Sequence, residues 1–307
     1  MAIFVETDMA VGLGALWART QDPATHQRWD LRFSDIAYAA TPEAGEPQRF
    51  SYGTRLGFGL VIRGAGETIA ERSRPDGGRV SVLRFWSASR LSLIREGRGY
   101  WSYTPIADGV RFRTVYDYDT RFGSIGRLVD RAVFRPLIGW ATAWSFDRLR
   151  LWLERGIDPG SSGRSAIVHG LARVGLAAIF AWHGVVPKLL GPDRTELRMI
   201  ADIGLPDAAT IGALRVMGAG EVVLALALLL TWHRAPLAGL TLVFACAATA
   251  VTAIASRDVV GGAFTPVTLN LGLGLLAAID LLTLDGIPSA GRCRRRPSIA
   301  GPAEVRP

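Results

Sequence analysis

Four long apolar stretches in the second half of the chain constrain its fold more than any other feature. They cover about residues 165–186, 211–232, 236–255 and 261–283. Each is about 20 residues long, which is the length of helix that crosses a hydrocarbon core of roughly 30 Å. Stretches such as 221–231 have no polar face, so buried helices of a soluble domain are the weaker interpretation. The sequence therefore predicts four membrane-spanning helices.

The positive charge of the chain lies outside this apolar block. The 307 residues carry a formal net charge of +8, but residues 166–287 hold seven basic and eight acidic side chains. Anionic lipid headgroups beside the spans suit this surplus. The chain lacks the aromatic and basic repeats of a nucleic-acid reader, so we expect no nucleic-acid partner. Only Cys246 and Cys293 are present, which excludes a disulfide framework and a thiolate metal site.

Basic residues near the span ends predict the orientation in the membrane, because they accumulate on the cytoplasmic side. One side would carry Arg148, Arg150, Arg155, Arg164, Arg234, Arg292, Arg294, Arg295 and Arg296. The other would carry only Lys188, Arg194, Arg198 and Arg257. Residues 1–8 have no basic region typical of a secretory signal. We therefore expect a multi-pass protein of the cell membrane with both termini in the cytoplasm.

The first half has the patterns of an α+β domain. Alternating polar and apolar residues, separated by turn signals, predict strands at 79–86, 90–94 and 109–118. Short helices are expected at 12–19 and 23–29, the second capped by Asp22. A long helix at 123–155 should be kinked by Pro136.

This order of elements resembles the START-like superfamily, also called SRPBCC, of polyketide cyclases and lipid-binding proteins. The segments 15–17 (ALW) and 26–30 (HQRWD) and the last helix carry the resemblance, over residues 1–155. It implies a helix-grip fold whose sheet wraps the last helix and leaves a cavity for a hydrophobic ligand. His26 lies in a turn-like context, and we expect it at the surface.

The aromatic residues of this half have a second interpretation, because aromatics at strand spacing more often fill a core than line a pocket. They are Trp17, Trp29, Phe58, Phe85, Trp86, Phe112 and Trp140.

Ionisable residues inside the spans need partners, because each costs at least about 2.5 kcal/mol at the bilayer centre. In the first span, His169, Arg173 and His183 share one helix face at 100° per residue. Arg173 and Glu221 lie at similar depths, which predicts an ion pair between them. Asp280 and His169 both lie near the cytoplasmic edge and are expected to pair.

At the outer edge, His183, Lys188 and Arg215 should gather, with Asp193 and Glu196 as candidate counter-charges. Lys188 is the only lysine of the chain. It has two interpretations, a ligand-binding cation or a side chain that extends to the headgroups.

A second resemblance covers about residues 166–284. The segments 181–190 (AWHGVVPKLL) and 192–197 (PDRTEL), then Glu221 and the stretch that ends at Asn270, resemble the DoxX-like membrane proteins. This resemblance implies a compact four-helix membrane bundle. Some relatives are linked to quinone or sulfur redox chemistry, but the cysteines of a thiol mechanism are missing here.

We therefore predict four segments. They are a START-like domain at 1–155, a linker at 156–165, an all-α transmembrane bundle at 166–284 and a disordered basic tail at 285–307.

Two functions fit this organisation. In the first, which is not enzymatic, the START-like domain captures a hydrophobic small molecule or lipid, and the bundle tethers it to the bilayer. In the second, the bundle is a quinone-linked redox subunit that works with a membrane redox partner or a second copy. A quinone is the one cofactor left open, since two histidines 14 residues apart on one helix cannot share a metal.

The candidate ligand-binding residues of the bundle are His183, Lys188, Arg215, Glu221 and Asn270. Alternatively, a polar network only holds the bundle together, formed by His169, Arg173, Glu221 and Asp280.

Overall fold

A computed structural model describes residues 2–39, 46–57, 59–261 and 265–297. The chain forms two units. The soluble unit runs to Ser162 and includes the segment from Pro288 onward, and the membrane unit is Gly163–Ile287. The first unit contains the sheet described below, and the second contains the long apolar helices.

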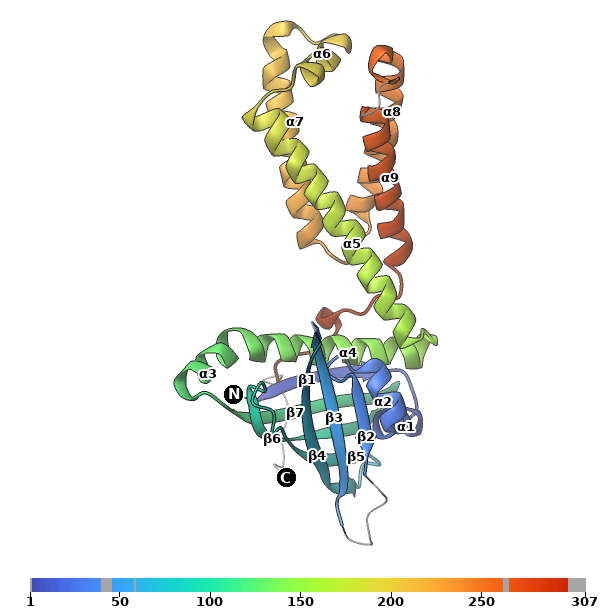
Figure 1. Cartoon of the computed structure of the whole chain (residues 1–307). Coiled ribbons are helices and arrows are strands. Elements are labelled where there is room, and N and C mark those ends of the chain that lie inside the picture. The colour runs from blue at the N-terminus through green and yellow to red at the C-terminus, as the bar shows by residue number, and fades with distance from the viewer. Residues whose placement is uncertain (1, 40–45, 58, 262–264, 298–307) are drawn as a thin grey trace. The chain divides into compact units, whose positions relative to one another are not determined.

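The soluble unit is built on one seven-stranded antiparallel sheet (Figure 1) with the order β1-β7-β6-β5-β4-β3-β2. The strands are β1 (Ile3–Met9), β2 (Asp35–Tyr38), β3 (Gln48–Gly57), β4 (Leu60–Ser73), β5 (Arg79–Trp86), β6 (Ile94–Ile106) and β7 (Gly109–Thr120). Alternate residues of β7 from Val110 to Tyr118 are buried, as expected for a sheet with one covered face. At the β6–β7 turn, Gly109 has a φ of 142°, and a Cβ there would lie 2.0 Å from the Met9 carbonyl oxygen. Only glycine fits this turn.

Helices cover that face of the sheet. The elements are α1 (Leu13–Gln21), α2 (Pro23–Trp29), α3 (Gly123–Val129), a π-helical turn (Asp130–Phe134) and α4 (Arg135–Arg155). Asp22 caps α2 as predicted, accepting from the Ala24 amide at 3.1 Å. Phe146 of α4 stacks on Phe112 of β7 with ring centroids 4.4 Å apart, and both are fully buried. A sheet that wraps its last long helix is the helix-grip architecture that the START-like resemblance implied.

Two local predictions need correction. Residues 90–94 are not a strand apart from Ile94, because Ser92 bonds the Ser89 and Ile94 carbonyls and so forms a turn. The predicted helix at 123–155 is interrupted by the π-helical turn. Pro136 follows this turn and has no N–H to donate to residue 132, which explains the break.

The aromatic residues divide between core and surface. Trp29 and Phe112 are fully buried, Trp17 and Phe85 are half-buried against the core, and Trp140 is exposed. Phe58 lies outside the described residues.

The predicted tail and linker are also wrong in the residues that the structure describes. The segment Ala290–Arg292 is a short 3-10 helix, and the Ser289 amide donates to Asp147 Oδ2 at 2.7 Å. Arg294 pairs with the backbone of Glu6 in β1 through two bonds of 2.8 and 2.9 Å. This segment is held by backbone pairing rather than by an apolar stripe, so periodicity did not reveal it. Residues 298–307 lie outside the described residues, and the linker is short because α5 begins at Pro159.

The membrane unit contains the four predicted spans. Its elements are α5 (Pro159–Gly184) with a π-helical extension (Val185–Leu190), α6 (Arg194–Asp202), α7 (Asp207–Leu230), α8 (Pro236–Ala255), a 3-10 turn (Arg257–Val259) and α9 (Pro266–Thr283). The extended α5, α7, α8 and α9 are long and apolar enough to cross a membrane. Because four spans return the chain to its starting side, residues before α5 and after α9 lie on the same side. Both segments belong to the soluble unit, which agrees with this parity.

Candidate functional site

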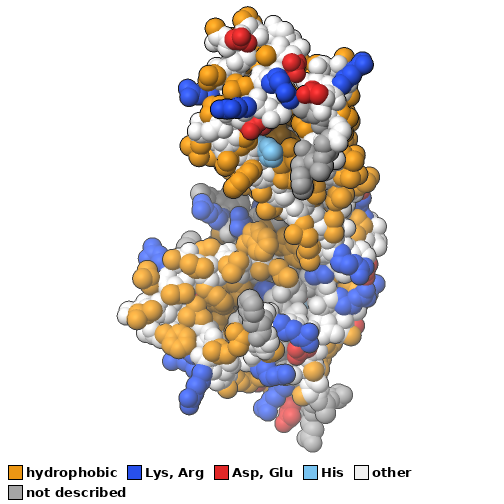
Figure 2. Space-filling model, turned by 45° about the horizontal axis from the view of Figure 1, so that its top comes forward, with side chains coloured by type: hydrophobic (Ala, Val, Ile, Leu, Met, Phe, Trp, Pro, Cys, Tyr) orange, Lys and Arg blue, Asp and Glu red, His pale blue; other side chains and the backbone are white. Residues whose placement is uncertain are grey.

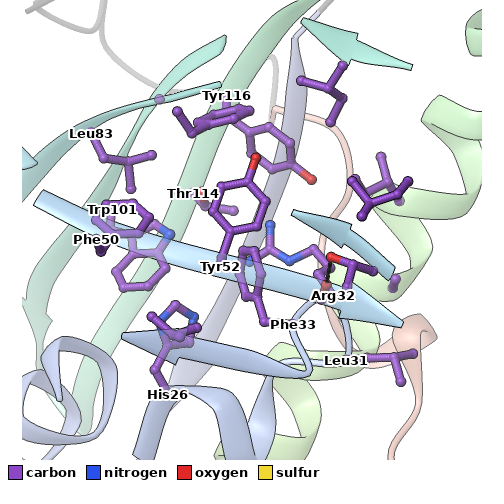
Figure 3. Close-up of a pocket in the computed structure, with 18 of the residues that line it drawn as sticks. His26, Leu31, Arg32, Phe33, Phe50, Tyr52, Leu83, Trp101, Thr114 and Tyr116 are labelled. Atoms are coloured by element: carbon purple, nitrogen blue, oxygen red, sulfur yellow. Dashed lines mark hydrogen bonds between the residues drawn. The ribbon is translucent and has the colours of Figure 1, made fainter. Parts of the chain in front are cut away.

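The soluble unit contains a cavity of about 450 Å³ between the sheet and the start of α4. Side chains from α2, the strands and α4 converge on this space (Figure 3). Its apolar lining includes Phe33, Phe50, Leu83, Phe85, Trp101 and Ile138.

A buried ion pair lies at the wall of this cavity. Arg32, which lines the cavity, donates from Nε to Asp30 Oδ1 at 2.9 Å and from Nη2 to Oδ2 at 2.6 Å. The Asp30 side chain is fully buried, and that of Arg32 is 12% exposed. Burial alone would raise the pKa of Asp30, but the Arg32 guanidinium and the His26 bond hold that pKa well below its usual range. Arg32 is therefore a permanently charged group at the wall of an apolar cavity.

His26 also lines the cavity, and its expected surface position is wrong. Its ring stacks on Trp29 at 4.8 Å, meets the edge of Trp101 at 5.1 Å and is 9% exposed. Its Nε2 lies 3.1 Å from Asp30 Oδ2. The spacing was the available signal, because positions 26, 29 and 30 share one face of a helix that begins at Pro23.

Hydroxyl groups complete the polar part of the cavity. Tyr116 Oη lies 2.9 Å from Thr142 Oγ1, and Tyr52 Oη donates to the Trp86 carbonyl at 3.3 Å. Burial raises the pKa of Tyr52 to about 12, so this phenol is neutral at physiological pH. The cavity thus offers a large apolar volume, the guanidinium groups of the largely buried Arg32 and the exposed Arg55, and neutral hydroxyl groups.

The membrane unit contains a buried network around Asp280. His169 Nδ1 lies 2.8 Å from Asp280 Oδ1, which confirms the predicted pair. Arg173 lies 3.6 Å from Asp280 Oδ2 and donates to the carbonyls of Leu228 at 3.1 Å and Trp232 at 2.7 Å.

The predicted Arg173–Glu221 pair is wrong. Arg173 also donates to the Arg234 carbonyl at 2.8 Å, so its donors serve backbone groups at and beyond the end of α7. The last carbonyls of a helix have no partner within the helix, and a guanidinium with five donors satisfies several at once. Glu221 lies 3.0 Å from Lys188 instead.

A second cavity, of about 710 Å³, lies within the membrane unit. Four of the five predicted binding residues line it: His183, Lys188, Glu221 and Asn270. Arg215 does not line it and is exposed.

Lys188 is the centre of the polar end of this second cavity. Its Nζ lies 3.0 Å from a carboxylate oxygen of Glu196 on α6 and 3.0 Å from one of Glu221 on α7. A close approach of two helices permits this, since a Cβ on Gly184 would lie 2.5 Å from the Gly218 carbonyl oxygen. Apolar residues such as Phe180, Phe244 and Leu273 form the other walls. Within the described part of the chain, His, Cys, Asp and Glu form no group of three or more suited to a metal ion.

The membrane unit is similar in sequence to a known protein family. Residues 177–278 match the DoxX-like family. A membrane protein of Bacillus subtilis (strain 168), described as uncharacterized membrane protein YndG, is 44% identical over 204 residues. The match covers 66% of this chain and 74% of the Bacillus protein. The chain is a DoxX-like membrane protein.

This DoxX-like protein also carries the helix-grip unit described above. A STAR-related lipid transfer protein fragment from Xanthomonas axonopodis is 14% identical, covers 50% of this chain and 85% of its own, and has a TM-score of 0.38. The protein TTHA0849 of Thermus thermophilus is 14% identical, covers 49% of this chain and 97% of its own, and has a TM-score of 0.38. The helix-grip assignment itself rests on the strand order and on the packing of α4 described above.

Proposed function

We propose that this DoxX-like protein binds a hydrophobic small molecule or lipid in its START-like unit and that the four-helix bundle tethers this unit to the bilayer. The cavity of about 450 Å³ is the observation that carries the proposal. It falls in the size range of small-molecule sites, roughly 300–1,000 Å³, and has their composition of apolar walls with a few convergent polar groups.

The polar groups define the chemical class of the ligand. Arg32 is a permanent cation, and Tyr116 and Tyr52 bring hydroxyl groups to the same cavity. A guanidinium in an apolar wall favours an oxygen acceptor, most of all a carboxylate or a carbonyl. The ligand is therefore a mainly apolar molecule with one oxygen-bearing polar end.

The proposed role is binding rather than turnover. Asp30 is engaged by Arg32 through both oxygens, and His26 is enclosed by aromatic rings. Neither is arranged as a mobile base over the cavity. We propose that the soluble unit lies in the cytoplasm, because nine basic residues near the span ends share its side of the membrane and only four lie on the other, and basic residues accumulate on the cytoplasmic side.

The test is native mass spectrometry of the full chain, purified in mild detergent, to find co-purifying lipophilic molecules. Leu83→Trp fills the cavity and should remove the bound species, because Leu83 is one of its walls. Ile69→Trp is the matched control, since Ile69 lies on the same sheet, is 53% exposed and does not line the cavity. A species that Leu83→Trp leaves unchanged would place the ligand elsewhere.

A second candidate function rests on the cavity of the membrane unit. There we propose that a quinone binds with its carbonyl oxygens at His183, Lys188 and Asn270, in a bundle that serves a membrane redox partner or forms a homo-oligomer. The support is that these predicted residues line one cavity with apolar walls. Quinone retained by the wild type but lost from Asn270→Leu, with unchanged occupancy of the soluble cavity, would favour this function. Equal quinone content in both proteins would reject it.

A further inference from the structure

An exposed apolar stripe runs along α3, the π-helical turn and the start of α4. It consists of Phe122, Ile125, Val129, Val133, Leu137 and Trp140 and is called the outer stripe here. Its members recur at intervals of three or four residues, so they share one helix face. Each exposes between 41% and 72% of its surface. Figure 2 shows hydrophobic side chains gathered over this end of the soluble unit.

A continuous stripe of this kind needs a partner, because soluble surfaces rarely expose large contiguous apolar patches. Its polar neighbours indicate which partner. Arg127 and Arg131 lie between stripe residues and are exposed, and the only acidic residue of this segment, Asp130, is buried against Tyr118 and Arg135. Apolar residues flanked by arginine are typical of helices that lie in the interface of an anionic bilayer.

The chain's own connections bring a bilayer within reach. α4 ends at Arg155 and α5, which continues as the first span, begins at Pro159. At the other end, α9 stops at Thr283, and Ser289 is already bonded to Asp147 of α4. The soluble unit is thus joined to the spans by two short segments. By helix rise alone, Trp140 is roughly 30 Å of chain from Pro159.

The outer stripe also borders the ligand cavity. Leu137 and Trp140 belong to the stripe and line the cavity as well. Leu31, which is 47% exposed, lines the same cavity. A surface that inserts these side chains into lipid would open the cavity at the membrane interface.

We propose that the outer stripe docks into the surface of the bilayer that holds the bundle, so that hydrophobic ligand passes between cavity and lipid without crossing water. The docking is independent of the bound molecule, whereas the passage of ligand rests on the proposed function. Arg127 and Arg131 add attraction to anionic headgroups, and the stripe supplies the apolar insertion.

The test places a fluorophore in the stripe of the full chain, reconstituted in phosphatidylcholine and phosphatidylglycerol vesicles. Ile125→Cys carries an environment-sensitive dye in a Cys246→Ala background. Cys293 can stay, because burial raises the pKa of its thiol to about 12 and leaves it unreactive. Ile69→Cys, on the exposed side of β4, is the matched control.

Docking predicts blue-shifted emission at position 125 that nitroxide-labelled lipids quench, with aqueous, unquenched emission at position 69. Replacing Val129 and Val133 by Ser should lower the docked population about tenfold or more. Aqueous emission at position 125 would overturn the proposal. So would blue-shifted emission that no labelled lipid quenches, since it would mean that protein covers the stripe.

Ligand content separates this proposal from the previous one. The Val129→Ser and Val133→Ser changes should leave the species found by native mass spectrometry in detergent unchanged, because neither side chain lines the cavity. Lipid quenching at position 125 in a protein that carries no ligand would support docking and reject only ligand binding.

Discussion

Each unit of this protein buries an aspartate together with an arginine and a histidine, but the two sets differ in what the arginine does. In the soluble unit, Arg32 gives two donors to Asp30 at 2.6 and 2.9 Å and lines a cavity. In the membrane unit, Arg173 lies 3.6 Å from its aspartate and bonds backbone carbonyls instead. The same three side-chain types thus serve a cavity in one unit and a helix end in the other. Composition alone does not separate these roles, but the acceptors of the guanidinium do.

The largest expected effect follows from breaking the buried pair of Asp280 and Arg173 in the membrane unit. Asp280→Asn leaves the fully buried Arg173 without its counter-charge. Removal of one partner from a buried pair costs about 3–5 kcal/mol. We expect a correspondingly large loss of stability in detergent, measured as the midpoint of SDS unfolding.

Glu221→Gln is the matched control for that change. Glu221 pairs with Lys188, which also pairs with Glu196, so its loss leaves one carboxylate on the lysine. The expected cost is clearly smaller than for Asp280→Asn. Equal losses from the two changes would contradict the assignment of Asp280 as the partner of Arg173.

Breaking the Asp30–Arg32 pair of the soluble unit should cost less stability, because Arg32 retains contact with the cavity. Asp30→Asn is expected to lower the free energy of unfolding by about 2–3 kcal/mol at pH 7. The folded-state pKa of Asp30 lies below its unfolded value of about 3.9, so the carboxylate contributes fully above that pH. As pH falls below about 4 towards the folded-state pKa, the contribution declines, and the gap between wild type and variant narrows.

Urea unfolding followed by tryptophan fluorescence at several pH values measures this gap. Seven of the nine tryptophans belong to the soluble unit, which makes the signal specific to it. Asp8→Asn, at a half-exposed ion pair with Arg111, is the control and should change stability by less than about 1 kcal/mol. A gap for Asp30→Asn that stays constant down to pH 3 would exclude the charged pair as its source.

The third prediction concerns Lys188, which joins α6 to α7 through two carboxylates. Lys188→Met removes the shared cation and leaves Glu196 and Glu221 facing the same cavity. We expect the free energy of local opening of α6 to fall by about 1–2 kcal/mol. This change is measured as faster amide exchange over residues 194–202. Arg198→Met, also on α6, breaks an exposed pair with Asp258 of the 3-10 turn and should change that exchange little. Similar exchange in both variants would show that Lys188 does not hold α6.

Residue type and depth predicted part of this arrangement. The His169–Asp280 pair followed from two ionisable residues at the same edge of the membrane, and the gathering around Lys188 from its place at the end of the first span. These predictions needed only helical rise and the cost of burying charge in lipid.

The failures share one physical cause, which is that a local pattern, or a depth counted along a helix, does not fix which residues become neighbours in space. Arg173 lies beside Leu228 and Trp232 at and just beyond the end of α7, whereas Glu221 lies earlier in that helix beside Lys188, so the similar depths expected from the sequence were wrong. His26 was misplaced because its burial depends on Trp29 and Trp101 closing over it. The ordered segment around Arg294 is held by strand pairing with Glu6, a contact between residues almost the whole chain apart.

The smallest expected change in stability comes from removing a hydroxyl group that faces the cavity, and it separates such groups from hydroxyl groups that only hold the fold. Tyr116→Phe removes a hydroxyl group from the cavity, while Thr142 keeps its bond to the Ile138 carbonyl at 2.8 Å. Stability should change by less than about 1 kcal/mol, and ligand affinity should fall by roughly fivefold to tenfold, as for one lost hydrogen bond. Titration with the molecule found by native mass spectrometry measures the affinity.

Tyr118→Phe is the counterpart on the same strand. Its hydroxyl donates to the buried Asp130 at 2.6 Å and does not line the cavity. This change should therefore cost stability, about 1–3 kcal/mol, and leave affinity unchanged, because it removes a hydrogen bond from the buried Asp130, which keeps Arg135, and none from a ligand. If Tyr116→Phe kept full affinity, the polar end of the ligand would have to lie at other polar groups of the cavity, such as Arg32 or Tyr52, and not at Tyr116.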